Sequence, residues 1–284
     1  MENIAIKMNG LNFSYAKQAV LFKDLNIFLK SGGICALLGK NGSGKTTLFK
    51  IITGLIFPEQ GACQVQGYNP AKREADFLEE IYFLPEALHV PKLTGKEYVN
   101  FYAKFYKQFD YFNFDNYLKE FNLSQNKLLT HFSQGEKKKF LIAFGLATNA
   151  RLLLLDEPTN GLDIPSKSQF RKLMASYVRD EKLILIATHQ VHDIENLIDS
   201  LVVLEEGKII FNQNLLDVAK KMAFLMTSKE PEPLASFYHE KRIGGYMAIA
   251  PNLQDEETQI DLEILFNAIL ANKTKIQSLF EGAC

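Results

Sequence analysis

A short glycine-rich segment between an apolar strand and a helix is the feature that most constrains this chain. The segment Gly39–Thr46 reads GKNGSGKT, follows the apolar run Ile34–Leu38 and precedes a predicted helix over Thr46–Leu55. In this strand-to-helix context the pattern GxxxxGK[ST] is typical of a loop that binds nucleotide phosphates. Glycines let the backbone turn its N–H groups toward phosphate oxygens, and the helix adds the positive end of its dipole. The chain must therefore contain a strand–loop–helix unit, which favours an α/β fold.

The loop also carries the side chains that a nucleotide site needs. Lys45 supplies a fixed cation for the β- and γ-phosphates, and the Thr46 hydroxyl is placed to bind Mg²⁺. We therefore predict that Mg²⁺ with ATP is bound here, through the loop residues Gly39, Asn41, Gly42, Ser43, Gly44, Lys45, Thr46 and Thr47.

A second apolar strand ends in two acids. Leu152–Leu155 runs directly into Asp156 and Glu157. Because parallel strands end at the same edge of a sheet, we expect both carboxylates beside the phosphate loop. Asp156 suits the Mg²⁺ shell, and Glu157 is placed to orient and polarise the attacking water. Together with the loop, this strand predicts an ATP-hydrolysing site.

The apolar segments predict a mostly parallel, covered sheet. Leu152–Leu155, Leu183–Ala187 and Leu201–Leu204 read as buried strands, with a helix near Ser166–Val178. Earlier segments predict further strands, at Ile4–Met8 and within Ala19–Leu29.

The stretch from about residue 87 to 150 is predicted to be helical. Thr94 and Glu97 have the spacing of a capping box. An aromatic stripe at helical spacing then follows, formed by Tyr98, Phe101, Tyr102, Phe105 and Phe109. Such a stripe is usually helical core, and the alternative is that some of its rings line a groove for a partner helix.

These motifs together make the chain resemble the ABC ATPase family over about residues 4–212. The segment Phe132–Glu136, FSQGE, resembles the LSGGQ signature and keeps its serine and second glycine. The resemblance implies that this segment closes over the γ-phosphate bound by a second, head-to-tail subunit, through Ser133, Gln134, Gly135 and Glu136. The alternative role of Ser133 is a plain helix cap.

Three further residues match the same family. The segment 158–163, PTNGLD, resembles the D-loop, which implies that Asp163 lies at the subunit contact. His189, in Ala-Thr-His after a strand, resembles the switch histidine that bonds the γ-phosphate. Tyr15 resembles the aromatic that stacks on adenine, with a packed strand tyrosine as the alternative. The predicted catalytic residues are therefore Glu157, His189 and Lys45.

One residue departs from the family pattern. Glu86 stands where the family usually has a glutamine that senses Mg²⁺ and the membrane partner. A carboxylate oxygen can also bind Mg²⁺, so the predicted metal ligands are Thr46, Glu86 and Asp156. The alternative is a solvated loop carboxylate.

The predicted fold is α/β, a P-loop NTPase core of the ABC type with a mostly parallel sheet and an antiparallel β subdomain. We assign residues 1–226 to the ATPase domain, with the helical subdomain at about 87–150. A helix is expected over Leu215–Leu225, and Thr227–Leu234 reads as a linker. Residues 235–284 form a small α+β module, with a hairpin turning at Gly244-Gly245 and an amphipathic helix near 262–270.

Composition limits the partners. The 32 basic and 33 acidic residues nearly cancel, which gives no electrostatic footprint for nucleic acid. The N-terminus has no apolar signal run, no stretch is long enough to cross a bilayer, and the dispersed Cys35, Cys63 and Cys284 form no CxxC pair. The resemblance implies a cytoplasmic subunit held on the inner face of the membrane by a separate permease, and pairing with a second ATPase subunit as a homodimer.

The resulting hypothesis is an ATP-hydrolysing motor of an ABC transporter. The alternative is a soluble ABC ATPase that acts on ribosomes or nucleic acid, although the single set of motifs and the lack of a heptad run disfavour it. A non-hydrolysing regulatory subunit is disfavoured because Glu157 and His189 are both present.

Overall fold

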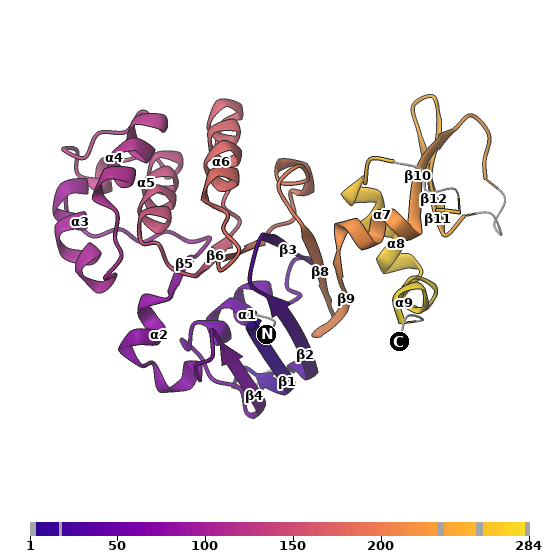
Figure 1. Ribbon diagram of the computed structural model, residues 1–284, viewed down its shortest axis with the longest axis horizontal. Helices are drawn as coiled ribbons and strands as arrows, with labels where there is room; N and C mark the ends of the chain where they lie inside the picture. Colours follow the sequence, from indigo (N-terminus) through magenta and orange to yellow (C-terminus); the bar gives the residue numbers. More distant parts are fainter. Residues whose placement is uncertain (1–3, 17–18, 232–235, 254–257, 282–284) are drawn as a thin grey trace.

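The computed structural model describes residues 4–16, 19–231, 236–253 and 258–281. Its centre is a six-stranded sheet in the order β5-β6-β7-β3-β8-β9 (Figure 1). Neighbouring strands are parallel except β8 and β9, which are antiparallel, so the predicted mostly parallel sheet is confirmed. The strands are β3 (Ile34–Leu38), β5 (Ile81–Leu84), β6 (Leu152–Asp156), β7 (Leu183–Ala187), β8 (Ser200–Glu205) and β9 (Lys208–Asn214).

The inner strands are apolar throughout because both faces of the sheet are covered. Along β3, Ile34, Ala36 and Leu38 belong to one hydrophobic core, and Cys35 and Leu37 belong to the other. Side chains alternate between faces along a strand, so a strand covered on both sides needs apolar residues at every position. This explains why these strands show no polar alternation in the sequence.

An antiparallel sheet and α1 (Lys45–Ile52) share one of the two cores. The sheet has the order β2-β1-β4, formed by β1 (Ile4–Ser14), β2 (Val20–Lys30) and β4 (Gln60–Val65). The short helix α2 (Ala75–Glu79) leads back into β5. The predicted antiparallel β subdomain and the helix after the glycine-rich loop are therefore confirmed.

The helical part stands to one side of the central sheet (Figure 1). It contains α3 (Gly95–Tyr102), α4 (Tyr111–Glu120) and α5 (Gln134–Ala147), and α6 (Ile164–Tyr177) rises beside it. The predicted capping box at Thr94 and Glu97 forms, with both reciprocal hydrogen bonds present. None of the helices in the described ranges combines the length and the apolar character that crossing a bilayer requires.

The aromatic stripe does not continue along one helix. Helix α3 ends at Tyr102, and a 3₁₀ turn over Ala103–Phe105 redirects the chain. Phe109 is buried and its ring packs 5.1 Å from that of Phe144 on α5, whereas Phe101 and Phe105 are 58% and 59% exposed. The predicted stripe through Phe109 is therefore wrong as a single helical face, because packing on α5 bends the segment.

The C-terminal part holds a third, antiparallel sheet in the order β10-β12-β11, with β10 (Met222–Thr227), β11 (Tyr238–Arg242) and β12 (Gly245–Pro251). The predicted hairpin is confirmed, with Arg242 paired with Gly245 across its turn. Helix α8 (Leu262–Ala271) packs against β11 and β12, and α9 (Lys273–Glu281) lies against β9 of the central sheet. Residues 232–235 of the predicted linker region, and Cys284, lie outside the described residues.

The segment just before this sheet differs from the predicted secondary structure. The helix predicted over Leu215–Leu225 ends at Lys221 as α7 (Leu215–Lys221), and β10 follows it. Buried Met222 and Phe224 face the same core, and β10 pairs along its whole length with β12. This pairing gives the segment more buried contact than another helical turn, so the C-terminal sheet begins before the predicted domain limit at residue 226.

We predict that Gly145→Ala destabilises the fold. A Cβ at this α5 position would collide with the ring of Tyr82 on β5. Overpacking of this kind costs about 1–3 kcal/mol in the free energy of unfolding, measured by urea denaturation. In a Tyr82→Ala background the penalty should disappear, because the ring is gone. A more stable Gly145→Ala single variant, as helix propensity alone favours by about 1 kcal/mol, would contradict this packing.

Candidate functional site

The phosphate loop lies between β3 and α1, as the sequence predicts. Gly42 and Gly44 have φ values of 81° and 105°, a region that a side chain disfavours. Gly44 immediately precedes α1 and has no side chain to cap the first turn, so N–H groups remain for a ligand. The hydroxyl of Ser43 is buried and has no hydrogen-bond partner among the described residues. These features fit a bound phosphate group.

Lys45 is held inside the loop. Its ammonium group donates to the carbonyl oxygens of Gly39 at 2.7 Å and Lys40 at 3.2 Å. Burial lowers the pKa of Lys45, and the carboxylates of Glu157, Asp156 and Glu86 act against that shift. The cation is therefore fixed beside three acids before any nucleotide arrives.

One cavity of about 510 Å³ joins the loop to those acids. It brings together most residues that the sequence predicts for ATP and Mg²⁺. They are Tyr15, Asn41, Gly42, Gly44, Lys45, Thr46, Thr47, Glu86, Asp156, Glu157 and His189. Gly39 lines a neighbouring cavity instead, and the hydroxyl oxygen of Ser43 is buried within the loop.

Thr46 and Asp156 form the first half of a candidate Mg²⁺ site. The Thr46 hydroxyl donates to Asp156 Oδ2 at 2.5 Å, which links α1 to the end of β6. Burial raises the pKa of Asp156, and the hydrogen bond from Thr46 acts in the other direction. Glu86 lines the same cavity from the loop after β5. Oxygen ligands of this kind are those that Mg²⁺ prefers, so the donor set fits the ion.

Glu157 is fixed by the segment after β7. Thr188 Oγ1 donates to Glu157 Oε2 at 2.9 Å, the His189 N–H donates to Oε1 at 3.1 Å, and His189 Nδ1 lies 2.7 Å from Oε1. The backbone of Glu157 has φ of 48°, a left-handed conformation that is unfavourable outside glycine. The sequence analysis did not identify Thr188, although it directly precedes His189.

Tyr15 lies at the edge of the cavity, just after β1. Its hydroxyl is 3.0 Å from Thr47 Oγ1, and its ring meets that of Phe13 edge-on at 4.9 Å between centroids. The ring is thus held in place at the cavity, and stacking on adenine stays a prediction.

The signature residues lie away from this cavity. Ser133 caps α5 in a capping box with Glu136, whose carboxylate accepts from the Ser133 N–H at 2.7 Å. Asp163 caps α6 by accepting from the Ser166 N–H at 2.9 Å. Within one chain these side chains therefore act as helix caps, and the predicted contacts of Ser133, Gln134, Gly135, Glu136 and Asp163 with a second subunit stay predictions.

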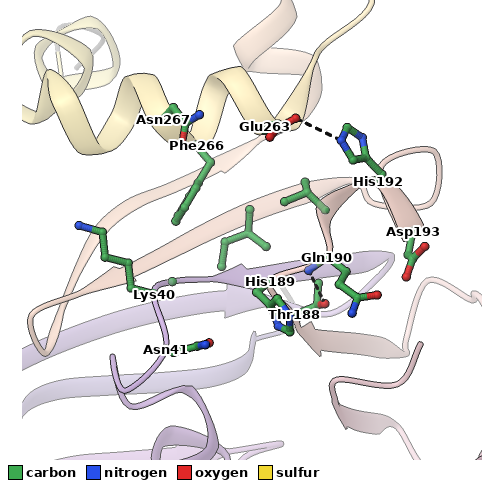
Figure 2. Close-up of a pocket in the computed structure, with 13 residues that line it drawn as sticks. Lys40, Asn41, Thr188, His189, Gln190, His192, Asp193, Glu263, Phe266 and Asn267 are labelled. Carbon is green, nitrogen blue, oxygen red and sulfur yellow. Dashed lines mark hydrogen bonds and ion pairs between the residues drawn. The ribbon is translucent and has the colours of Figure 1, made fainter. Parts of the chain in front are cut away.

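A second cavity of about 600 Å³ adjoins the first (Figure 2). Asn41 and His189 line both cavities. Helix α8 forms the opposite wall through Glu263, Phe266 and Asn267. Helix α8 therefore contacts the segment after the candidate switch histidine, and no local sequence signal indicates this contact.

Two ion-pair groups attach the C-terminal part to the loops around the nucleotide cavity. His192 lies 3.1 Å from Glu263 and 3.4 Å from Glu195. Glu205 at the end of β8 lies 3.6 Å from Lys40 of the phosphate loop and also pairs with Lys273 of α9. The segment after β7 thus pairs with α8 through His192, and the phosphate loop is linked to α9 through Glu205.

Comparison with known proteins agrees with this site. A family model described as ABC transporter matches residues 22–160. The ABC transporter ATP-binding protein NatA of Bacillus subtilis (strain 168) is 30% identical over 196 residues, 66% of this chain and 80% of NatA. The bacitracin transport ATP-binding protein BcrA of Bacillus licheniformis is 34% identical over 212 residues, 72% of this chain and 68% of BcrA.

Solved structures show the same architecture. An ATP-binding subunit of an ABC transporter superposes with a TM-score of 0.68 at 27% identity, over 75% of this chain and 91% of that one. The cbiO1 protein of Clostridium perfringens, part of the transporter complex cbiONQ, gives a TM-score of 0.62 at 27% identity, over 76% and 91% of the two chains.

Glu86 should influence the Mg²⁺ requirement. We predict that Glu86→Ala raises the Mg²⁺ concentration for half-maximal ATPase activity, because an oxygen ligand is lost. Glu86→Gln should keep activity within about tenfold, or about 1.4 kcal/mol, of the parent. The measurement is a Mg²⁺ titration of the ATPase rate, with the exposed Glu74→Ala as control. Superimposable curves would show that Glu86 does not contribute to metal binding.

The His192 contact should depend on pH. Partial burial lowers the pKa of His192, but its hydrogen bonds and ion pairs with Glu195 and Glu263 outweigh this and raise the pKa above its usual 6.5. The contact therefore stabilises the fold fully below about pH 6.5 and is lost as the pH rises through the raised value. The melting temperature of His192→Gln should fall below that of the parent in acid, and the two should converge at alkaline pH. A constant difference would exclude this titration.

Proposed function

Because this chain belongs to the family of ABC transporter ATP-binding proteins, we propose that it hydrolyses Mg²⁺–ATP to drive a transporter whose membrane-spanning part is a separate chain. One observation carries the proposal. Lys45, Thr46, Asp156, Glu157 and His189 come from three separate segments and line a single cavity. This is the set of cation, metal ligands and base that ATP hydrolysis requires.

The residues divide into binding and hydrolytic roles. The loop N–H groups and Lys45 bind the phosphates, and Thr46, Asp156 and Glu86 hold Mg²⁺, which neutralises charge on the phosphate oxygens when bound. Glu157 orients and polarises the attacking water, and its fixation by Thr188 and His189 supports this role. Half of the His189 side chain is exposed to the cavity, which suits a contact with the γ-phosphate.

We assign the signature segment to a second subunit's site. Ser133 and Gly135 begin α5 at the surface, apart from the cavity in their own chain. A head-to-tail dimer would place the N-terminal end of this helix over the partner's γ-phosphate, where its dipole favours negative charge. ATP would then hold two subunits together, and hydrolysis would release them.

A surface groove of about 530 Å³ is our candidate for the site that receives the permease. It lies between the core and the helical part, and its wall includes Leu55, Phe83, Tyr102 and Phe105. Leu55 and Phe105 are 52% and 59% exposed, an apolar surface of the kind that binds a partner helix. The sequence-based alternative that some aromatics line a partner groove is consistent with this placement.

We predict that Glu157→Gln binds ATP but hydrolyses it at least about a hundredfold more slowly, because an amide is a poor base. ATP should then accumulate as a bound species that holds two subunits together. Gel filtration with Mg²⁺–ATP should show a dimer for this variant and a monomer without nucleotide. Wild-type turnover in Glu157→Gln, or a monomer despite bound ATP, would contradict the proposed roles.

The partner that stimulates the ATPase rate distinguishes the proposed transporter function from its alternative. Co-reconstitution with the cognate permease in vesicles should raise the ATPase rate, whereas ribosomes or nucleic acid should leave it unchanged. The reverse result would favour a soluble ATPase that acts on those partners.

A further inference from the structure

Lys138 is a buried cation that none of the roles above uses. It lies on α5, one turn after the signature segment that begins the helix, and it is 5% exposed. Lysine is almost never this buried unless its ammonium group is paired. Its contacts therefore require an explanation within the fold.

The ammonium group of Lys138 reaches the loop that carries the catalytic carboxylate. It donates to the carbonyl oxygen of Glu157 at 2.7 Å and to that of Asn160 at 2.8 Å. These two carbonyls belong to the turn in which the Asn160 N–H also donates to Glu157 at 3.3 Å. Glu157 has its left-handed φ of 48° at this turn, so Lys138 fixes a backbone conformation that would otherwise be unfavourable.

The first turn of the same helix touches the same loop. A Cβ at Gly135 would lie 3.1 Å from the carbonyl oxygen of Gly161. Helix α5 therefore meets the loop at two points, Gly135 at its start and Lys138 one turn later. A displacement of the signature segment cannot leave the Glu157 turn unaffected, because one rigid helix carries both contacts.

Nearby carboxylates favour the charged form of the buried Lys138 side chain. Burial lowers its pKa, and the carboxylates of Glu86, Glu157 and Asp156 act against that shift. The same three acids surround Lys45. These carboxylates therefore favour the charged form of Lys138, which is the form that donates to the carbonyl oxygens of Glu157 and Asn160.

We propose that Lys138 is a positioning residue that fixes the turn of Glu157 and links this catalytic carboxylate to the signature helix of its own subunit. The inference rests on the proposed ATPase function. A change at the signature helix, where a second subunit would bind, then alters the placement of Glu157 in the same chain through one side chain. Lys138 itself lies behind the carboxylate and contacts backbone oxygens, so it is not a catalytic residue.

The test compares variants at one position in the full-length protein. Lys138→Met keeps an unbranched side chain of similar length but removes the charge and the hydrogen bonds. Lys138→Gln restores a donor without the charge. Lys137→Met is the matched control, because adjacent residues of a helix point about 100° apart. Circular dichroism and thermal melting establish that each variant is folded before kinetics are measured.

We expect the Lys138 variants to lose turnover while they keep their affinity for ATP. Lys138→Met should lower kcat at least about tenfold, because a small misplacement of a catalytic group is costly. The KM for ATP and the affinity for a fluorescent ATP analogue should stay within about threefold of the parent, and Lys138→Gln should fall between the two. Unchanged kcat in Lys138→Met would overturn the proposal. An equal loss of kcat and ATP affinity would also overturn it, since it would mark general damage to the fold.

If Lys138→Met does not fold, Lys138→Gln is compared with the parent in the same kinetic and binding measurements.

The parent protein distinguishes failure of this inference from failure of the proposed function. A parent that does not hydrolyse ATP, alone or with its permease, would contradict the proposed function itself. An active parent with an equally active Lys138→Met variant would contradict only the role of Lys138.

Discussion

Parallel pairing of β3, β6 and β7 is the constraint on which the rest of the site depends. β7 lies between β3 and β6 and is parallel to both, so all three strands end at one edge of the sheet. That edge gathers the phosphate loop after β3, the acids at the end of β6, and Thr188 and His189 after β7. The apolar side chains that bury both faces of these strands hold the edge rigid, because a close-packed core resists small displacements.

Glu157 is held in place by contacts to the rigid elements around it. Its backbone N–H donates to Ala187 of β7 at 2.8 Å, its carboxylate is held by Thr188 and His189, and its carbonyl accepts from Lys138. Two separate parts of the chain, β7 with the segment that follows it and helix α5, therefore fix one residue in an unfavourable backbone conformation. A group held in this way needs little reorganisation in the role we propose for Glu157, the activation of water.

The C-terminal part also contacts segments at this edge of the sheet. Helix α8 reaches His192, and α9 reaches Glu205, which also pairs with Lys40 of the phosphate loop. The first residues of strand β10, which begins this part, were expected to be helix, because the predicted helix ran over Leu215–Leu225. A short apolar run of this kind fits a helix or a strand equally well, and only its pairing with β12 decided the outcome.

The sequence by itself determined the phosphate loop, the positions of the buried strands along the chain and most of the residues in the nucleotide cavity. These follow from short motifs and continuous apolar runs, in which each signal lies within a few neighbouring residues. Only the tertiary structure decided which loops meet across long separations. Thr188 against Glu157, Lys138 against Asn160 and Glu263 against His192 join residues 31, 22 and 71 positions apart. Such contacts depend on how whole elements pack, because no local pattern records which side chain will lie opposite another.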